Sequence, residues 1–364
     1  MMPRVAVVRA DNRRGAVAQA LALIAEEVKS VVADEVLIKP NLVSHVNPLA
    51  STHADALSAT LDALFAAGAC RAVVAEGASD ASAGFERFGH ARECHGRPVR
   101  FLDINRDEHD WRTIDLLAAD GLSTRPARIS GTVVDAACRV SLAIPKTHVV
   151  STITLSMKNM LSGIHPADRV RMHGHAGGNG ASGLKGLVVE LLKRDNFGVK
   201  MLTQLMGRIR STLPKRQEDL GPRDLAFLAS VRALHANIAR LNAAVGPHIS
   251  VVDGFVGMHR EGPRHGSPIV LGVAIAGTDA VAVDAVAAAV MGFDARSIGF
   301  LRHAEAAGLG VADLDGIEVV GDPIAAVRRR FVPHSNERVL RHRDGIGSAI
   351  PRMHVAARSA ASRR

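Results

Sequence analysis

Short apolar runs along this chain alternate with longer stretches in which apolar residues recur every three or four positions. The short runs predict buried strands, and the longer stretches predict amphipathic helices. The predicted strands are 4–9, 35–38, 71–75, 99–104, 140–144, 249–252, 269–276 and 317–320, and the predicted helices are 16–32, 55–67, 184–213, 224–245 and 280–291. Because strands and helices alternate through most of the chain, we expect an α/β fold with a largely parallel sheet and helices on both faces.

Two of the predicted helices follow one another without a strand between them, which predicts a helical insertion at about residues 184–245. The second helix carries an apolar stripe that is typical of core packing. The stripe consists of Leu228, Val231, Leu234, Ile238, Leu241 and Val245. The first is basic from Lys193 to Lys215 and could lie on a membrane surface, although a solvated helix face is the simpler interpretation. Segment 105–137 has no clear period, and we expect its Trp111 to be half buried.

Polar side chains directly follow three of the predicted strands. These side chains are Lys39 and Asn41, then Glu76, then Lys146 and His148. In an open α/β sheet, ligands bind in the crevice outside the carboxyl ends of the strands. We therefore expect these groups to line one pocket, in which the lysines would hold an anion.

A second polar group lies a few residues downstream. Ser151 or Thr152 could cap a following helix, and Lys158 and Asn159 would lie on that helix. Hydroxyl groups and a helix N-terminus would add hydrogen-bond donors for the anion. The alternative is a strand, a polar turn and a surface helix with ordinary solvated lysines.

Two further carboxylates are candidates for the site. Asp253 follows the strand 249–252 and is the preferred acid to assist proton transfer by His148 and Lys146. Asp284 lies inside a run of Ala and Val, where a carboxylate should be paired or functional. Glu76 could equally belong to a simple turn.

His173 and His175 form a His-x-His pattern before a glycine-rich segment, and they could share a divalent metal if that segment is extended. No third ligand can be identified, so a histidine-bearing lid is the alternative. Three cysteines, Cys70, Cys94 and Cys138, form no CxxC motif and cannot alone supply a four-cysteine iron–sulfur cluster. Two of them, Cys70 and Cys138, adjoin apolar runs and are expected in the core.

Positive charge is concentrated at the C-terminal end. Residues 323–364 carry ten arginines and two carboxylates, a net charge of +8, which leaves +1 of the total +9 for residues 1–322. We therefore expect an α/β body over 1–322 and a flexible basic tail over 323–364, which could contact nucleic acid or an acidic surface. The absence of tyrosine argues against a platform for stacking bases. With no membrane-length apolar run and a strand directly at the N-terminus, a cytoplasmic location is expected.

The order and spacing of five short motifs resemble the domain-of-unknown-function 362 family. The motifs are residues 38–42, 145–148, 154–159, 253–254 with 262–263, and 282–285. The resemblance extends over about residues 4–322 and implies a cytoplasmic α/β protein, often fused to ferredoxin-type cluster domains, without an established general activity. The cysteine count excludes that cluster module here. The family is also similar, at the level of the fold, to the N-terminal domain of nickel-pincer lactate racemases.

Two functions of different classes are compatible with these residues. The first is an enzyme that acts on a small carboxylate or phosphate by lysine and histidine acid–base chemistry, with or without a divalent metal. The second is a non-catalytic accessory protein that binds an anion or cofactor and serves iron–sulfur or redox systems. Lysines that converge without a titrating carboxylate nearby would favour binding over catalysis.

Overall fold

The computed structural model describes residues 2–77, 80–107, 110–175, 197–213 and 215–343. Its strands are β1 (Arg4–Arg9), β2 (Glu35–Lys39), β3 (Arg71–Glu76), β4 (Val99–Asp103), β5 (Trp111–Leu117), β6 (Thr124–Ser130), β7 (Cys138–Ala143), β8 (Lys146–His148), β9 (Thr152–Thr154), β10 (Ile249–His259), β11 (Ser267–Gly277) and β12 (Glu318–Gly321). The helices along the chain are α1 (Arg13–Ala22), α2 (Ala25–Val31), α3 (Ala54–Ala66), α4 (Ala81–Arg87), α5 (His90–Glu93), α6 (Gly131–Asp135), α7 (Ser156–Asn159), α9 (Phe197–Ser211), α10 (Pro222–Val245), α11 (Ala280–Val290), α12 (Gly299–Ala306), α13 (Ile324–Val327) and α14 (Glu337–Leu340). Within these ranges, none of the helices combines the length and the apolar character needed to cross a membrane.

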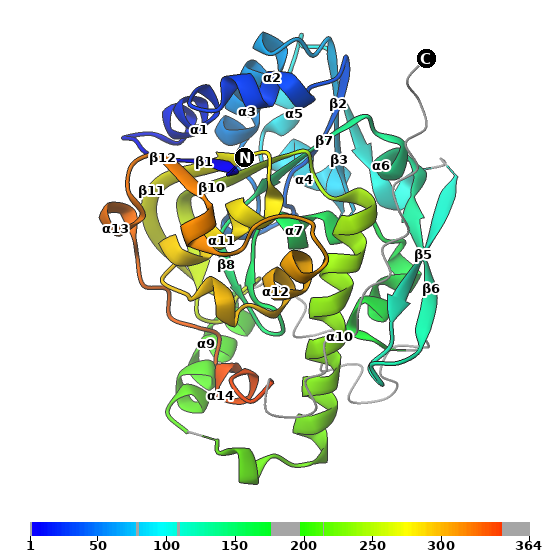
Figure 1. The fold of residues 1–364 in the computed structure, drawn as a ribbon, viewed down its shortest axis with the longest axis vertical. Coiled ribbons are helices and arrows are strands. Elements are labelled where there is room, and N and C mark those ends of the chain that lie inside the picture. The colour runs from blue at the N-terminus through cyan, green and yellow to red at the C-terminus, as the bar shows by residue number, and fades with distance from the viewer. Residues whose placement is uncertain (1, 78–79, 108–109, 176–196, 214, 344–364) are drawn as a thin grey trace.

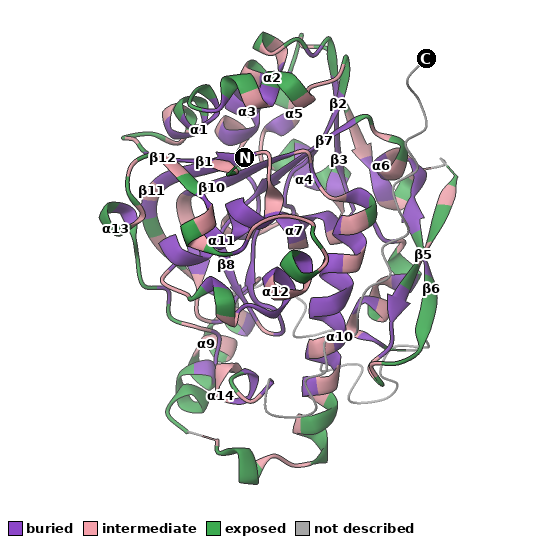
Figure 2. Cartoon of the chain, viewed as in Figure 1, coloured by how far each residue is buried: buried purple, intermediate pink, exposed green. Residues whose placement is uncertain are grey.

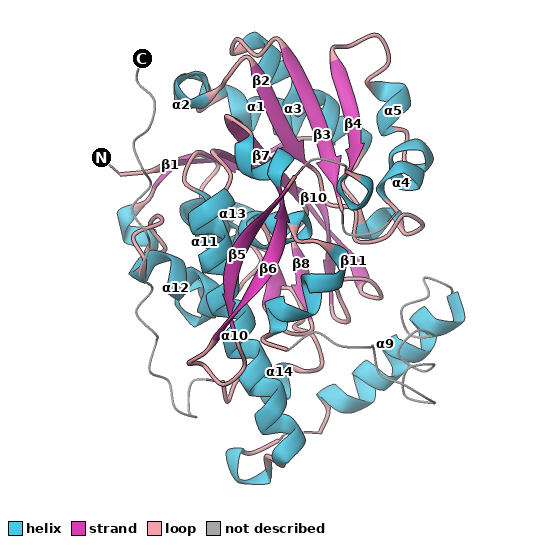
Figure 3. Ribbon diagram, turned by 90° about the vertical axis from the view of Figure 1, so that its right-hand side faces the viewer, coloured by secondary structure: helices cyan, strands magenta, loops and turns pink. Residues whose placement is uncertain are grey.

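One large sheet organises the chain, with the strand order β12-β1-β11-β10-β7-β2-β3-β4 (Figures 1 and 3). The pairs β12–β1, β10–β7, β7–β2, β2–β3 and β3–β4 are parallel, whereas β11 is antiparallel to both of its neighbours. The expectation of a largely parallel sheet is therefore confirmed. A separate antiparallel hairpin, β5–β6, forms in the segment that had no clear period, and its Trp111 is half buried as expected.

Both faces of the sheet are covered, because successive side chains of a strand point to opposite faces. In β1, Val5 and Val7 join one apolar core, and Ala6 and Val8 join the other. Helices α1 and α3 cover the second core, and α10, α11 and α12 cover the first. Figure 2 shows the two buried layers on either side of the sheet.

The helix predicted at residues 16–32 is divided into α1 and α2, and the strands predicted at 249–252 and 269–276 extend into the long antiparallel pair β10–β11. The apolar stripe of α10 is confirmed, since all six of its predicted members are buried. Five of these residues, all except Leu228, pack in the main core, so the helix is buried against the sheet along this stripe. Of the other predicted helix, 184–196 lies outside the described residues and the remainder corresponds to α9.

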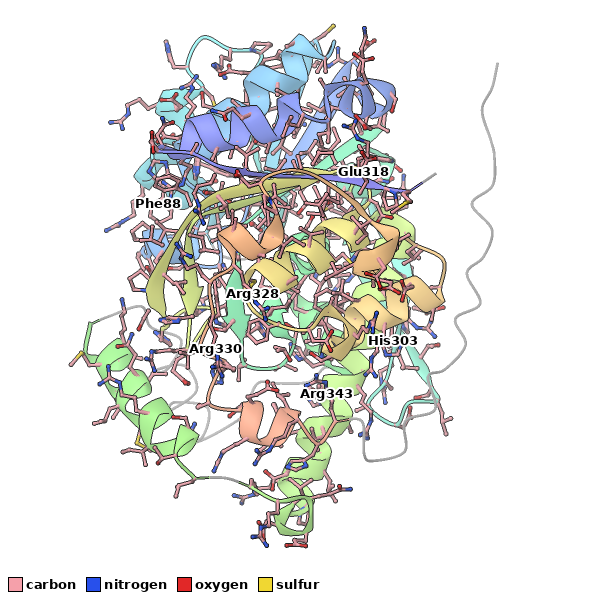
Figure 4. All side chains as sticks on the ribbon, turned by 60° about the vertical axis from the view of Figure 1, so that its left-hand side comes forward. Phe88, His303, Glu318, Arg328, Arg330 and Arg343 are labelled. Atoms are coloured by element: carbon pink, nitrogen blue, oxygen red, sulfur yellow. The ribbon has the colours of Figure 1, made fainter. Side chains whose placement is uncertain are left out.

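The segment expected to be a flexible tail is packed on the body as far as residue 343. It carries α13 and α14, and Figure 4 marks its path by Arg328, Arg330 and Arg343. Between its arginines the segment carries buried apolar side chains, namely Val327, Phe331, Val339 and Leu340. The surrounding charges made these residues look like part of a solvated tail in the sequence. The guanidinium of Arg343 donates to Leu340 O at 3.0 Å and to Ser297 O, so one of the arginines serves to hold the segment in place.

We expect the Leu340→Ala variant to lose about 2–5 kcal/mol of unfolding free energy, because a fully buried leucine leaves a cavity when it is truncated. The matched change Val332→Ala, at a side chain that is 36% exposed, should cost less than about 1 kcal/mol. Chemical denaturation followed by circular dichroism measures both. If the two variants were equally stable, the packing of this segment on the body would be contradicted.

Candidate functional site

Three adjacent strands bring the predicted polar groups together. Strands β7, β2 and β3 are neighbours and parallel, so their carboxyl ends meet at one edge of the sheet. Lys39 is the last residue of β2 and Glu76 the last of β3, while Lys146 follows β7 by three residues. All three residues therefore start from the same edge of the sheet.

The polar groups form a buried hydrogen-bonded network. The ammonium of Lys39 donates to Glu76 Oε2 at 2.6 Å, to Pro40 O at 2.6 Å and to Asn159 Oδ1 at 3.2 Å. Asn41 Nδ2 donates to Asn159 Oδ1 at 2.9 Å, and Lys146 donates to Asn41 Oδ1 and, at 3.1 Å, to Ala50 O. These side chains are at most 4% exposed, so the network is internal and does not line an open pocket.

The charge of Lys39 is neutralised within this network. Burial would raise the pKa of Glu76, but the charge and hydrogen bond of Lys39 lower it overall. With three acceptors around its ammonium group, Lys39 has no donor left for a ligand. Lys39 and Glu76 therefore act as structural partners, and the charge available to a ligand lies elsewhere.

Asn159 fixes the short helix α7 against the sheet. Its Oδ1 accepts from Lys39 and Asn41, and its Nδ2 donates to Lys39 O at 2.8 Å and to Ser141 Oγ at 3.1 Å. All four hydrogen-bonding positions of the amide are thus occupied. The other end of α7 is held by Asp284, whose carboxylate accepts from the backbone N–H groups of Ser156 at 2.8 Å and Met157 at 2.9 Å.

Asp284 therefore caps α7 and does not face a ligand. Burial raises the pKa of this carboxyl to about 7, against the two backbone donors that favour the charged form. A carboxylate inside an apolar helix is paired here with the first turn of another helix, which satisfies both of its oxygens. The functional consequence is that Lys158, in the middle of α7, is held at a defined place.

The hairpin β8–β9 presents polar side chains on one face. Lys146 pairs with Thr154, and His148 pairs with Thr152. Directly opposite residues of an antiparallel pair share a face, as do residues two apart. Both threonine hydroxyls are buried and have no hydrogen-bond partner among the described residues. Buried hydroxyls of this kind normally bond to water or a ligand, so this face is a candidate binding surface.

His148 is held in one tautomer by the turn of the hairpin. Its Nδ1 accepts from the backbone N–H groups of Val150 at 3.0 Å and Ser151 at 3.2 Å. Burial, and then the charge of Lys158, keep the pKa of His148 well below its usual value. The neutral ring consequently carries its proton on Nε2, so His148 can donate a hydrogen bond into the site but is poorly placed to act as a base.

Lys158 is the cation without a partner in this cluster. Over the described ranges, no hydrogen bond or ion pair is formed by its ammonium group. Burial lowers the pKa of Lys158 to about 8. Its charge in turn lowers the pKa of Lys146 and His148, which places the three groups close to one another.

Two more histidines surround this cluster. His173 and His334 both lie near enough to His148 to lower its pKa, and burial lowers the pKa of each of them to about 4. His334 Nε2 lies 3.2 Å from Glu261 Oε2, and its neighbour Asn336 donates to Val149 O at 3.5 Å. His334 and Asn336 therefore lie beside the turn of the β8–β9 hairpin.

The described residues offer no complete metal site. His173 faces the cluster, whereas His175 is exposed, and no group of three potential ligands occurs in the part of the chain that is described. The charge of Lys158 acts on His173, which disfavours a divalent cation between them. The metal at His173 and His175 stays a prediction. Of the three cysteines, Cys94 and Cys138 are buried, but Cys70 is exposed, contrary to expectation.

The predicted role of Ser151 or Thr152 as a helix cap is wrong. Ser151 and Thr152 do not cap a helix, because they lie in the turn and second strand of the hairpin, and α7 begins at Ser156. The Ser151 hydroxyl donates to Ile153 O at 2.7 Å and so stabilises the turn. Thr152 has a φ of 66°, an uncommon backbone conformation for a β-branched residue.

Asp253 does not join the lysine cluster. It lies inside β10 and not at its end, and strand alternation places it on the same face as Ile249 and Val251, which pack beneath α1 and α3. Its carboxylate is 2.9 Å from Arg13 Nε in α1. Burial raises the pKa of Asp253, and the Arg13 charge opposes that shift. The ion pair fixes α1 on the sheet.

Sequence reasoning missed two groups of the cluster. Thr154 lies within the stretch that was expected to form a helix after Ser151 or Thr152, because the hairpin is too short to show a strand period. His334 was assigned to a flexible tail, and no local signal indicated that it packs beside His148. Only a search for apolar residues within the arginine-rich segment, such as Phe331 and Leu340, could have suggested that it folds back on the body.

The fold and the cluster define an α/β protein with lysines and neutral histidines at the carboxyl edge of its sheet. A family model described as "Domain of unknown function (DUF362)" matches residues 36–289, so the chain belongs to that family and the resemblance is confirmed. Among solved structures, the chain is similar to the lactate racemase apoprotein from Thermoanaerobacterium thermosaccharolyticum, with 14% identity and a TM-score of 0.35 over 47% of this chain and 40% of that chain. It thus spans less than half the length of that protein.

The chain is also similar to a protein from Thermotoga maritima, with 10% identity and a TM-score of 0.41 over 75% of this chain and 57% of that chain. No curated protein sequence matches.

We expect Glu76→Gln to lower the unfolding free energy by about 3–5 kcal/mol, because it leaves the Lys39 ammonium buried without a counter-charge. The same two strands offer a matched control in Glu35→Gln, whose pair with Arg71 is exposed and should contribute less than about 1 kcal/mol. Urea denaturation at neutral pH gives both values. Similar losses in the two variants would contradict the structural role assigned to the buried pair.

Proposed function

We propose that this protein binds a small carboxylate or phosphate at the face of the β8–β9 hairpin and acts on it as an enzyme. The proposed binding groups are Lys146, Lys158, the Nε2–H of His148, and the hydroxyls of Thr152 and Thr154. The observation that carries the proposal is the uncompensated positive charge of this cluster. Lys39 is paired with Glu76, but within the described residues neither Lys146 nor Lys158 has a carboxylate partner.

An anion would relieve the main energetic cost of this arrangement. Two ammonium groups in a partly dry site repel each other, and burial lowers the pKa of both. A bound anion would favour their charged forms and would also give the two unpaired threonine hydroxyls an acceptor. The positive charge of the lysines, the unpaired threonine hydroxyls and the burial of the site thus all favour an anionic ligand.

Lys158 is the group best suited to move a proton. A lysine with a pKa near 8 is partly neutral at physiological pH. While Lys146 holds the anion, the neutral fraction of Lys158 could take a proton from the bound substrate. His148, as the neutral Nε2–H tautomer, would donate a hydrogen bond to the negative charge that develops. This assignment moves the role of base from His148, where the sequence suggested it, to Lys158.

A second candidate function is binding without turnover, as an accessory protein. The observation in its favour is that the candidate carboxylates are already committed: Glu76 to Lys39, Asp253 to Arg13 and Asp284 to α7. An enzyme of this kind would depend on lysine and histidine alone. Turnover distinguishes the two functions, since both require the same anion site.

We expect Lys158→Met to weaken binding of inorganic phosphate or acetate by about 1.5–3 kcal/mol, with little change in stability. Affinity of the unchanged protein should fall as the pH rises through about 8, because the ammonium that attracts the anion is then lost. For the same reason, binding near pH 8 should take up protons, which makes the calorimetric enthalpy depend on the buffer. Lys29→Met, at an exposed lysine of α2, is the control. Unchanged affinity in Lys158→Met would refute the proposed site.

Proton transfer is tested separately, on those carboxylates that bind. In D₂O, an enzyme of the proposed type should exchange a carbon-bound hydrogen of its substrate for deuterium, which proton NMR detects. Lys158→Met should abolish this exchange, and Lys29→Met should retain it. Binding without exchange across a panel of small carboxylates and phosphate esters would favour the accessory function.

A further inference from the structure

Helix α9 presents a continuous apolar face to solvent. Figure 3 shows this helix extending away from the body, on the side where α14 and the first part of α10 lie. Side chains three and four residues apart share a helix face. The exposed members of this face are Met201, Leu202, Leu205, Met206 and Ile209, each between 40% and 56% exposed, and Leu213 continues the face beyond the helix. An apolar face of this extent on a folded chain indicates a binding surface.

The opposite face of α9 is committed to the body. Gly207 packs so closely on Glu261 that a Cβ atom at this position would lie 2.3 Å from the carboxylate. Gln204 Nε2 donates to His265 O at 3.0 Å. Because these contacts fix the rotation of the helix about its axis, the apolar face is held outward by the fold.

Positive charge borders the apolar face on both sides. Arg208 follows Leu205 by three residues and Arg210 follows Met206 by four, so the two arginines flank the stripe. The helix also carries Lys200 and has no carboxylate from residue 197 to 211. Within the described ranges, none of these three cations forms an ion pair. An apolar stripe between basic residues is the pattern of a helix that lies in the plane of a membrane surface.

We propose that α9 docks this protein on an anionic lipid surface, with its apolar side chains in the acyl boundary and its arginines at the headgroups. The charge of the helix selects this occupant over a second copy of the chain. Two α9 helices packed face to face would bring Arg208 and Arg210 of each close to those of the other, with no carboxylate on either helix to offset the repulsion. Anionic headgroups would neutralise the same charges.

Docking by α9 would also bring the membrane close to the hairpin cluster. Glu261 contacts Gly207 of α9 on one side and His334 on the other, and His334 lies near His148. The proposal itself does not depend on the anion site. It concerns where the protein is held, and either conclusion can fail without the other.

The test is co-sedimentation of the full-length protein with phosphatidylcholine vesicles that contain or lack phosphatidylglycerol. We expect binding to the anionic vesicles, weakening with added salt. The double variant Leu202→Glu/Ile209→Glu should bind at least about tenfold more weakly, because it places carboxylates in the acyl boundary. Arg208→Gln and Arg210→Gln should each weaken binding by about fivefold. Thermal melting should be unchanged, since all four side chains are exposed.

Leu122→Glu is the matched control, because this leucine is 90% exposed on the turn between β5 and β6 and lies outside α9. It should bind vesicles as the unchanged protein does. Vesicle binding that survives the double glutamate variant would assign membrane contact to another surface and overturn the proposal. Absence of vesicle binding, or a dimer by light scattering that the double variant disrupts, would overturn it as well.

Discussion

The candidate site depends on the stabilisation of one buried ammonium group, that of Lys39. An unpaired charge at this depth would cost several kcal/mol, so the surrounding groups must supply acceptors in fixed positions. Glu76 supplies the counter-charge from the neighbouring strand, and Asn159 supplies an acceptor from α7. Because Asn159 also bonds to Lys39 O and Ser141, the same interaction ties α7 to two strands. The buried charge thus determines where the following residues stand.

As a consequence, residues of the same type have different roles in this part of the structure. Lys39 and Lys158 are both lysines near the end of the sheet, but the first is neutralised inside the protein and the second is left without a partner in the described structure. Asp284 contributes indirectly, because it holds the first turn of α7 from within α11. The groups that remain available to a ligand are those on the hairpin and on α7. Structural polar residues and candidate binding residues are neighbours here. They can be distinguished only by whether their hydrogen-bonding groups already have partners within the protein.

The corrections to the sequence interpretation share one cause, which is that local patterns do not report which face of an element a residue occupies. Asp253 was expected beside the lysines because it follows an apolar run. The strand continues past it, and the alternation of β10 places its side chain on the side of α1, where Arg13 pairs with it. In segment 323–343, buried residues such as Leu340 are spaced too irregularly among arginines to show a period, and packing on the body alone orders them.

The sequence by itself determined the α/β class, the parallel strands, the buried stripe of α10, and the gathering of Lys39, Asn41, Glu76 and Lys146 at one sheet edge. Those features follow from hydrophobic periodicity and from the rule that parallel strands end together. Tertiary structure alone decided which charges are neutralised, which ring nitrogen of His148 carries the proton, and that His334 approaches from the far end of the chain. Hydrogen-bond partners and burial determine whether a side chain is protonated and whether it is available to a ligand. Partners and burial in turn depend on contacts between residues far apart in sequence.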